Sequence, residues 1–319
     1  MKRWHSTEFP EASIADNAVI EGEEVSIAPG ARIESGVFIA ARRVSIGWGT
    51  VIERDTSVRG LGRVMEDFTV GDQAFIGFAN QILAPAFAMG DYSQLHNSGL
   101  SSGYKDLSLG HNCWVGQNSI LNCTERLSIG NNVRIGTGSQ LWTHVASGEL
   151  LEGCTLYGEN PLTLEDNVWV VGGGVISPGL TLGRNTIVMT GSVLTKSTKP
   201  FHSYAGVPAK DVSDKLNFWK PISDREKAQM MIGFIADFKS EFPQYSNAIQ
   251  YAEQFPHGAP DTLGQIVVAL TVSDWDAARQ SGISLFDISS KTYLKQRSML
   301  EAAWIRWLVG YRARFLPRA

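Results

Sequence analysis

Residues 125–144 read ERLSIGNNVRIGTGSQLWTH, and residues 164–194 read LEDNVWVVGGGVISPGLTLGRNTIVMTGSVL. Both stretches place an aliphatic residue at every sixth position, as in Ile129, Ile135 and Leu141. The same step recurs along most of residues 14–195 and forms seven aliphatic triplets. These are Ile27, Ile33 and Ile39; Ile46, Ile52 and Val58; Val70, Ile76 and Ile82; Leu109, Val115 and Leu121; Ile129, Ile135 and Leu141; Leu164, Val170 and Ile176; and Leu182, Val188 and Leu194. An internal repeat of this kind decides the architecture before any single motif does.

A step of six predicts a mostly β protein, a parallel β-helix with a triangular cross-section. Each aliphatic residue would lie in mid-strand and point into the interior of a prism, and three six-residue faces would close one coil. Coils stack at the strand spacing of about 4.8 Å, so seven coils would make a rod roughly 34 Å long. A β-sandwich is the alternative, but its strands alternate apolar and polar residues with a period of two, which does not explain steps of six.

The spacing between triplets predicts where insertions leave the prism. The step is six inside every triplet, whereas the step from one triplet to the next varies from 6 to 27 residues. Every extra residue should therefore leave at the same corner. The two longest excursions, residues 83–108 and 143–163, are expected to lie near each other on that edge. Loops on a rigid scaffold are where binding and catalysis concentrate.

The repeat and the segment that follows it resemble the hexapeptide-repeat acyltransferase family over about residues 14–212. The family's closing pattern, GDNVWIGxGAxIxPGVxIG followed by GAGSVVTK and AGxPAK, is closely matched by residues 164–210, with departures at Val171 and Thr190. The resemblance, which extends to bacterial sugar O-acetyltransferases, implies a left-handed β-helix over residues 1–212, an accepted exception to right-handed crossovers. It also implies a homotrimer with acetyl-CoA or another acyl-CoA as co-substrate.

Acyl transfer from a thioester to a hydroxyl or an amine requires a general base, and histidine is the natural base near neutral pH. His144 lies three residues after Leu141, where a long insertion leaves the prism, and Thr143-His144 matches the family motif that ends in the catalytic histidine. His96, in the other long excursion, is the alternative base. A surface histidine on a loop is the competing interpretation of His144.

Three further residues are expected near this base. Asn122 lies in the column of Trp142 one coil earlier, about one strand spacing from the His144 region. In sugar acetyltransferases of the family an asparagine near this position contacts the acceptor, so the resemblance makes Asn122 a catalytic candidate, with a turn-stabilising asparagine as the alternative. Glu125 could orient the imidazole, contact a sugar or be a solvated charge. Glu125, Trp142 and His96 are the predicted acceptor-binding residues.

The resemblance further implies a coenzyme groove along the later coils. The family holds the pantetheine arm through backbone groups at small-residue corners, and its AGxPAK segment sits near the adenosine phosphates. The matching positions here are Gly173, Gly174, Gly191, Ser192, Lys196, Ala205, Pro208 and Lys210. The two lysines could face phosphates, although a lone lysine is usually only solvated. The chain has no GxGxxG or GKT/S nucleotide-binding element.

Composition narrows the function classes. The net charge of −4 gives no general case for nucleic-acid binding. Three cysteines without CxxC spacing argue for a reducing compartment and against a disulfide framework or a zinc site, so no metal is expected. Neither a signal-like apolar run nor a window of about 20 apolar residues is found, which makes the cytoplasm the expected location.

Several functions stay open at this point. The favoured one is transfer of an acyl group, most simply acetyl, to a hydroxyl of a small carbohydrate-type acceptor, as in bacterial polysaccharide biosynthesis. The alternatives are N-acyl transfer to an amino sugar or an antibiotic, and a β-helix scaffold without catalysis. A γ-class carbonic anhydrase shares the fold but needs an HxxxxH pair, which the chain lacks.

Residues 213–319 are predicted to form a second, small α/β region that is largely helical. Residues 224–242 have helical periodicity, 265–274 read as a strand, and 293–315 read as an amphipathic helix rich in arginine and tryptophan. A cap over the end of the β-helix is the simplest role, since solenoids need one. Acceptor recognition and peripheral contact of 293–315 with an anionic membrane are the alternatives.

Overall fold

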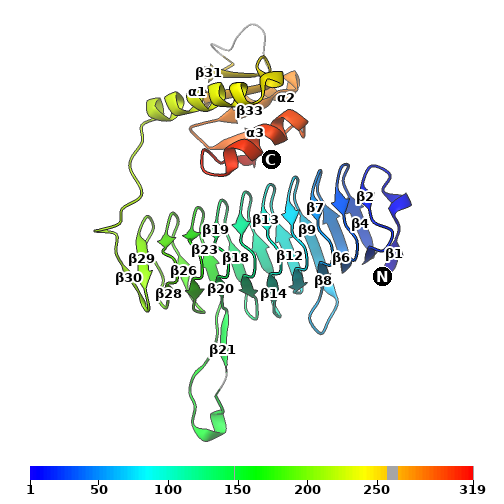
Figure 1. Ribbon diagram of the computed structural model, residues 1–319, viewed down its shortest axis with the longest axis vertical. Coiled ribbons are helices and arrows are strands. Elements are labelled where there is room, and N and C mark those ends of the chain that lie inside the picture. Colours follow the sequence, from blue (N-terminus) through cyan, green and yellow to red (C-terminus); the bar gives the residue numbers. More distant parts are fainter. Residues whose placement is uncertain (147, 257–264, 319) are drawn as a thin grey trace. The chain divides into compact units, whose positions relative to one another are not determined.

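The computed structural model describes residues 1–146, 148–256 and 265–318. They form two compact units, Met1–Trp219 and Lys220–Ala319. The first unit is a parallel β-helix, seen edge-on in Figure 1 as a row of stacked coils. In each coil the chain passes through three sheets in turn, which we call sheets C, B and A.

The strands of each sheet pair in parallel with those of the neighbouring coils. Sheet A contains β3 (Val19–Gly22), the first part of β6 (Phe38–Ile46), β8 (Ser57–Arg59), β11 (Gln81–Leu83), β14 (Leu100–Ser102), β17 (Ile120–Asn122), β20 (Gln140–Leu141), β25 (Val175–Ile176) and β28 (Val193–Leu194), with β1 (Lys2–Trp4) added antiparallel at its start. Sheet B contains β2 (Ser13–Ile14), β5 (Arg32–Ile33), β7 (Val51–Ile52), β10 (Phe75–Ile76), β13 (Gln94–Leu95), β16 (Trp114–Val115), β19 (Arg134–Ile135), β24 (Trp169–Val170), β27 (Ile187–Val188) and β29 (Ser203–Gly206), with β30 (Ala209–Asp211) antiparallel at its end. Sheet C contains β4 (Glu24–Ile27), the second part of β6, β9 (Met65–Val70), β12 (Ala86–Met89), β15 (Leu107–Leu109), β18 (Leu127–Ile129), β23 (Leu162–Leu164) and β26 (Thr181–Leu182).

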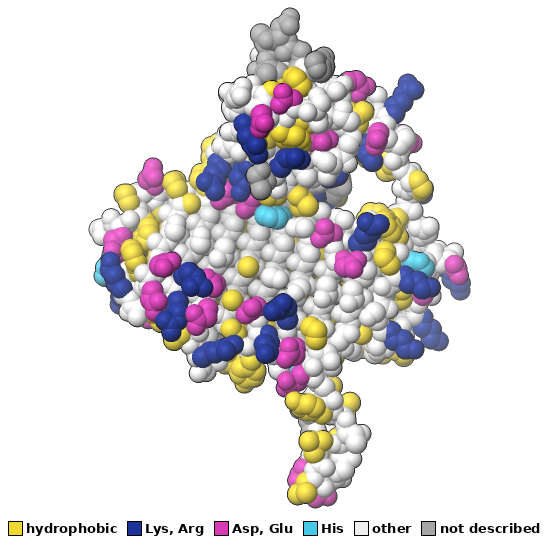
Figure 2. Space-filling view, turned by 180° about the vertical axis from the view of Figure 1, so that it is seen from behind, with side chains coloured by type: hydrophobic (Ala, Val, Ile, Leu, Met, Phe, Trp, Pro, Cys, Tyr) yellow, Lys and Arg dark blue, Asp and Glu magenta, His cyan; other side chains and the backbone are white. Residues whose placement is uncertain are grey.

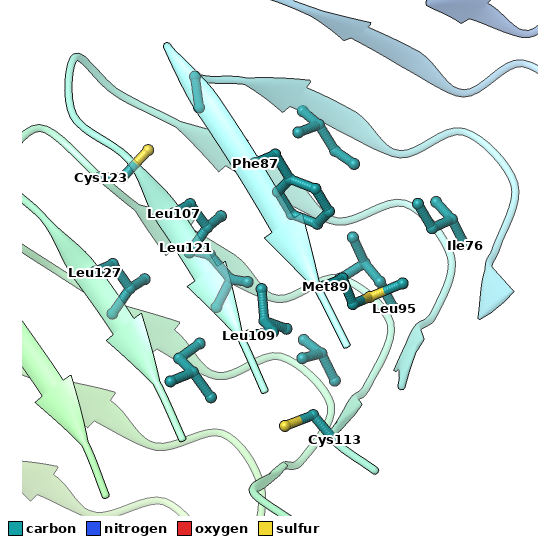
Figure 3. Close-up of a cluster of buried hydrophobic side chains, with 14 of the residues drawn as sticks. Ile76, Phe87, Met89, Leu95, Leu107, Leu109, Cys113, Leu121, Cys123 and Leu127 are labelled. Atoms are coloured by element: carbon teal, nitrogen blue, oxygen red, sulfur yellow. The ribbon is translucent and has the colours of Figure 1, made fainter. Parts of the chain in front are cut away.

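The predicted interior is confirmed. Of the 21 aliphatic residues in the seven triplets, only Ile27 remains partly exposed, and all the others are buried. Figure 3 shows side chains of successive coils, such as Met89 and Leu109, pointing into the same interior. Each fully buried aliphatic side chain contributes about 1.5–3 kcal/mol relative to an exposed one, so this column is the main source of stability of the unit.

Two of the three corners are tight turns that use a left-handed backbone. The residue three positions after each buried strand residue has a positive φ at the corner from sheet C to sheet B and again at the corner from sheet B to sheet A. From C to B these residues are Gly30, Gly49, Gln73, Tyr92, Asn112, Asn132, Asn167 and Asn185. From B to A they are Gly36, Asp55, Ala79, Ser98, Asn118, Gly138, Gly173 and Gly191. Gly, Asn and Asp adopt this conformation at the lowest cost, which explains why they dominate both rows.

The third corner, from sheet A to sheet C, carries the insertions. Residues between β8 and β9 protrude there, and so does a long hairpin made of β21 (His144–Ala146) and β22 (Tyr157–Glu159) (Figure 1). Figure 2 shows hydrophobic side chains along this hairpin and acidic ones at its tip. The prediction that long insertions leave at one corner is thus confirmed for the hairpin.

The expected excursion over residues 83–108 is wrong. Strands β12, β13 and β14 make this segment a further complete coil, with Met89, Leu95 and Ser101 buried at steps of six. The coil was missed because its third interior position is a serine, whose small side chain fits the prism without being aliphatic. As a consequence, the 83–108 segment does not form a loop beside the hairpin.

The second unit is a five-stranded sheet with helices. Its elements are α1 (Asp224–Glu241), β31 (Ile249–Phe255), β32 (Ile266–Val272), α2 (Trp275–Ser281), β33 (Ser284–Asp287), β34 (Thr292–Leu294), α3 (Met299–Val309) and β35 (Leu316–Arg318). The strands lie in the order β31-β32-β33-β34-β35, and β34 runs antiparallel to β33. The helix expected over 224–242 and the strand expected over 265–274 are confirmed as α1 and β32.

The long helix expected over residues 293–315 is much shorter in the structure. Ser298 caps α3 by accepting a hydrogen bond from the backbone of Glu301, and the residues on both sides pair in the sheet as β34 and β35. The apolar face of α3, including Trp304 and Leu308, is buried inside the unit. That face is therefore occupied by core packing, contrary to a membrane-facing role. Among the described residues, no helix combines the length and the apolar character that a membrane crossing requires.

The added coil can be tested by comparing two leucines within it. Leu95 is 1% exposed and faces the interior, whereas Leu100 is 38% exposed and faces outward. Leu95→Ala should lower the free energy of unfolding of the β-helix by about 2–5 kcal/mol, and Leu100→Ala should change it much less. Urea unfolding followed by circular dichroism measures both, and equal effects would show that this segment is not a coil.

Candidate functional site

The structure places His144 at the mouth of the projecting hairpin. Strand β20 of sheet A ends at Leu141, the chain turns away at the A-to-C corner, and Thr143 is fully buried there. His144 is half-buried and begins β21, where it pairs with Glu159 of β22. Its backbone is therefore held by the hairpin and by the last buried residue of the coil, which fixes where the imidazole can lie.

Asn122 lies one coil earlier and contacts His144 directly. Its Oδ1 is 3.0 Å from His144 Nδ1, and it also accepts hydrogen bonds from the Thr143 hydroxyl at 2.7 Å and the Thr143 backbone N–H at 3.2 Å. The proximity arises because Asn122 ends β17 and Trp142 follows β20, and these two strands pair in sheet A. Asn122 is only 8% exposed.

This contact determines which nitrogen of His144 carries the proton. A backbone N–H can only donate, so the Asn122 side-chain atom that receives the Thr143 N–H is the carbonyl oxygen and not the amide nitrogen. His144 Nδ1 faces that oxygen and must itself donate. In the neutral imidazole the lone pair then lies on Nε2, which is the form required of a general base.

Other nearby groups complete the hydrogen bonding of this pair. The Asn122 amide nitrogen donates to the Ser102 carbonyl and to Thr124 Oγ1, each at 3.2 Å, and Thr124 Oγ1 is also 3.2 Å from His144 Nδ1. Both ends of the Asn122 side chain are thus engaged within the protein. This arrangement holds His144 and leaves little of Asn122 to contact an acceptor.

Trp142 and Glu125 also lie at this corner. The Trp142 ring meets the His144 ring edge-on, with 5.9 Å between the centroids, and its Nε1 donates to Gln140 Oε1 at 3.2 Å. Glu125 is half-buried and donates its backbone N–H to Thr143 Oγ1 at 3.0 Å. The structure therefore brings together four of the predicted acceptor-site residues, namely His144, Asn122, Trp142 and Glu125.

His96 does not lie at this corner, which corrects the expectation that it leaves the same edge. It follows β13 on sheet B, where its ring packs between Phe75 and Trp114 at centroid distances of 5.5 and 4.9 Å. Its Nε2 is 3.1 Å from Gln94 Oε1, and burial lowers the pKa of the imidazole. The misplacement follows directly from treating residues 83–108 as a loop.

The glycines predicted to hold the coenzyme lie at a different corner, from sheet B to sheet A. Gly173 and Gly191 occupy the left-handed position of successive coils, and Gly138 occupies it one coil earlier. A Cβ atom added at any of the three would meet no atom within 4 Å, so together they form an open strip of bare backbone. Sequence reasoning missed Gly138. Gly174 differs, because its added Cβ would lie 2.6 Å from Val170 Cγ1 in the interior.

The remaining residues predicted to bind the coenzyme lie near the end of the β-helix. Ser192 is buried and its hydroxyl accepts a hydrogen bond from the Gly206 N–H at 3.1 Å. Ala205 pairs with Lys210 across the hairpin of β29 and β30, whose turn contains the cis bond before Pro208. Lys210 is exposed, and so is Lys196, which follows β28 on sheet A.

The open glycine strip and the His144–Asn122 pair do not meet within one chain. Gly138 opens the sheet A segment of its coil and His144 follows its end, six residues later. At about 3.3 Å per residue these six residues span at most roughly 20 Å, and Gly138 lies at the B-to-A corner whereas His144 lies at the A-to-C corner. The open glycine strip and the His144–Asn122 pair therefore lie at opposite edges of sheet A. Among the described residues, no group of three or more His, Cys, Asp or Glu side chains is arranged to hold a metal ion.

The structure thus combines a β-helix of hexapeptide repeats with a histidine where the longest insertion leaves the coil. The chain is similar in sequence to galactoside O-acetyltransferase from Escherichia coli strain K12, with 30% identity over 138 residues, which cover 43% of this chain and 62% of the relative. Galactoside O-acetyltransferase from Lactococcus lactis subsp. lactis is 28% identical over 96 residues, covering 30% of this chain and 46% of the relative. The resemblance to hexapeptide-repeat acyltransferases is thus confirmed, over less than two thirds of the length of these relatives.

Solved structures of the same kind are also similar. A polysialic acid O-acetyltransferase is 16% identical over 66% of this chain and 88% of its own, with a TM-score of 0.36. A hexapeptide-repeat acetyltransferase from Vibrio cholerae in complex with acetyl coenzyme A is 17% identical over 53% of this chain and 69% of its own, with a TM-score of 0.27. No protein-family model matches the chain.

The tautomer of His144 can be measured directly. In the wild-type protein the ¹⁵N chemical shifts of the neutral ring should report a proton on Nδ1, because Asn122 Oδ1 accepts from that atom. Asn122→Ala should give a mixture of tautomers. Gln140→Ala, which removes the partner of Trp142 but leaves Oδ1 in place, is the control. A wild-type ring that holds its proton on Nε2 would contradict the assignment.

Proposed function

We propose that this protein transfers an acetyl group from acetyl-CoA to a hydroxyl of a carbohydrate acceptor. The observation that carries the proposal is the His144–Asn122 pair, which leaves a lone pair on Nε2 at the corner where insertions leave the coil. The similarity to galactoside O-acetyltransferases supports both the reaction and the acceptor class. We also propose a cytoplasmic location, as expected for an enzyme that uses acetyl-CoA.

His144 would act as the general base. Its Nε2 takes the proton of the acceptor hydroxyl while the hydroxyl oxygen attacks the carbonyl carbon of the thioester. The tetrahedral intermediate then collapses with cleavage of the carbon–sulfur bond, and the departing thiolate takes the proton from the imidazolium. The products are the acetyl ester and the free thiol of CoA. Asn122 would be a positioning residue that stabilises the required tautomer and, later, the imidazolium.

Acceptor binding would involve the groups around this base. Trp142 offers an aromatic surface beside the imidazole, on which the apolar face of a sugar ring can pack. The Glu125 carboxylate lies on the same corner and can accept hydrogen bonds from sugar hydroxyls. His96 stays outside this acceptor site, since it lies on sheet B.

The open strip of Gly138, Gly173 and Gly191 is the best candidate for the pantetheine arm. Bare backbone at consecutive coils lets an extended chain approach closely and exposes peptide groups for hydrogen bonding. Ser192, Gly174 and Ala205 would form the floor of the groove. Lys210 would offer a cationic group to the phosphates from the hairpin whose turn contains Pro208. Lys196 lies at the opposite edge of sheet A and would face a coenzyme held by a second copy.

The separation of these two groups supports a homotrimer. The strip and His144 lie at opposite edges of sheet A, so a second copy that presents its strip to His144 would complete the site. The hairpin that begins at His144 carries Leu150, Leu151 and Leu156, which are 61–88% exposed. Exposed apolar groups of this kind mark interaction surfaces, and packing on a neighbouring copy would cover them.

Replacing the base tests the mechanism. General-base catalysis contributes about 10²–10⁴-fold, so His144→Ala should lower kcat by about that factor. Binding of acetyl-CoA should persist, because other coils form its groove. His96→Ala is the matched control and should retain activity. Near-normal kcat in His144→Ala together with loss of activity in His96→Ala would reverse the assignment.

Mixed assemblies test the coenzyme residues and the shared site together. Lys210→Glu should raise the dissociation constant of acetyl-CoA, most strongly at low salt, since it reverses a charge near the phosphates. When His144→Ala and Lys210→Glu chains are refolded together in equal amounts, about a quarter of the sites should combine an intact His144 with an intact Lys210 and regain activity. Lys105→Glu, at an exposed position, is the control for charge. A mixture no more active than its components would argue against sites shared between copies.

A further inference from the structure

An alternating row of aromatic and polar side chains runs along the outer side of sheet B. Because the strands are in register, the residues that precede the buried position stack directly from coil to coil. In chain order they are Phe75, Gln94, Trp114, Arg134 and Trp169. We call these five residues, together with His96, the aromatic strip. The strip belongs to neither the His144 corner nor the glycine corner.

The strip has a regular spacing imposed by the fold. Neighbouring strands lie about 4.8 Å apart, and an aromatic residue occurs at every second coil. Phe75, Trp114 and Trp169 are therefore separated by roughly 9.6 Å from one to the next. His96 fills the space between the first two, with ring centroids 5.5 Å from Phe75 and 4.9 Å from Trp114.

The strip is open to ligands. Trp169 is 46% exposed, and Phe75, Gln94, Trp114 and Arg134 are partly exposed. Large aromatic side chains on the outside of a β-helix contribute nothing to its interior, which the aliphatic column already fills. Hydrophobic side chains gathered on one exposed surface mark an interaction site.

We propose that the aromatic strip binds an extended carbohydrate polymer along the axis of the rod. A pyranose ring linked through equatorial bonds adds roughly 5 Å to an extended chain, as its bond lengths dictate, so two units span close to two coils. Every second ring of such a polymer could stack on Phe75, Trp114 and Trp169 in turn. The C–H groups on a pyranose face carry partial positive charge and pack well on the negative face of an aromatic ring.

The polar members of the strip fit the same ligand. The amide of Gln94 and the guanidinium of Arg134 lie at the coils between the aromatic residues, where the polymer would present hydroxyl or carboxylate groups. An α-linked polymer coils and cannot follow a straight row at constant spacing. The strip should therefore bind extended polymers in preference to coiled ones. It is distinct from the acceptor site at His144. Binding to it does not depend on acetyl transfer.

Two other occupants would use an apolar row on this sheet, namely a second copy of the chain and the Lys220–Ala319 unit of the same chain. The composition of the strip favours the carbohydrate, because Gln94 and Arg134 alternate with the aromatic residues and an apolar contact between protein surfaces would bury these polar groups. Both alternatives can be recognised by their effects on solution mass and on proteolysis.

Isothermal titration of the full-length protein without acetyl-CoA tests the proposal. The probes are hexasaccharides of β-1,4-linked glucose, N-acetylglucosamine and mannose, with α-1,4-linked maltohexaose as the shape control. At least one β-linked probe should bind, and maltohexaose should not. Trp169→Ala and Trp114→Ala should each weaken binding about tenfold. Tyr311→Ala, which removes an aromatic side chain that is 82% exposed elsewhere, should leave it unchanged.

Several outcomes would overturn the proposal. These are no binding by any β-linked probe, equal binding of maltohexaose, and unchanged affinity in Trp169→Ala. A lower solution mass of Trp169→Ala would assign the strip to contacts between copies. Faster proteolysis within residues 213–223 of that variant would assign it to the second unit. Trp169 is the informative position if Trp114→Ala fails to fold, because its side chain is exposed. Since only binding is measured, the result is independent of whether His144 is the base.

Discussion

The parallel hydrogen bonding of each coil on the next is the constraint on which the rest of this structure depends. It fixes the spacing along the rod, so side chains at equivalent positions of successive coils form columns. The interior column is aliphatic, and the outer columns are free to carry other chemistry. Two side chains that are about twenty residues apart in the chain can therefore lie in contact without a loop to position either of them.

The His144–Asn122 pair is a product of these columns. Asn122 ends β17, and the chain that follows β20 in the next coil brings Thr143 and His144 onto it. Thr143 is fully buried, and its hydroxyl and its backbone N–H both donate to Asn122 Oδ1. These two bonds fix the orientation of the Asn122 side-chain carbonyl independently of His144. The position of the imidazole then depends on rigid coils on one side and on the hairpin on the other.

Most of the fold could be predicted from the sequence, because each face of a coil takes six residues and therefore places an interior residue at every sixth position. Prediction failed where an interior position is filled by a polar residue small enough to fit, as with Ser101, and this error moved His96 to the wrong edge. The grouping of His144, Asn122, Trp142 and Glu125 could be anticipated from their columns. The hydrogen-bond direction at Nδ1 could not, since it depends on the Thr143 backbone N–H. The bounds of α3 were also missed, because residues 293 and 294 pair in the sheet as part of β34 and Ser298 caps the helix.

The corners and outer faces of the prism can present different groups to a ligand, because the backbone conformation that closes the coil differs from one corner to the next. The corners from C to B and from B to A are closed by one left-handed residue per coil, and neither has room for an insertion. Only where that residue is glycine and unobstructed, at Gly138, Gly173 and Gly191, does a tight corner expose backbone to a ligand. The A-to-C corner has no such turn in most coils, so it can release a hairpin and present a histidine at its base. Sheet B has no insertions and stays flat, which suits it to a long ligand rather than to a reaction. The chemistry of each edge is thus set by the local conformation that closes the coil there.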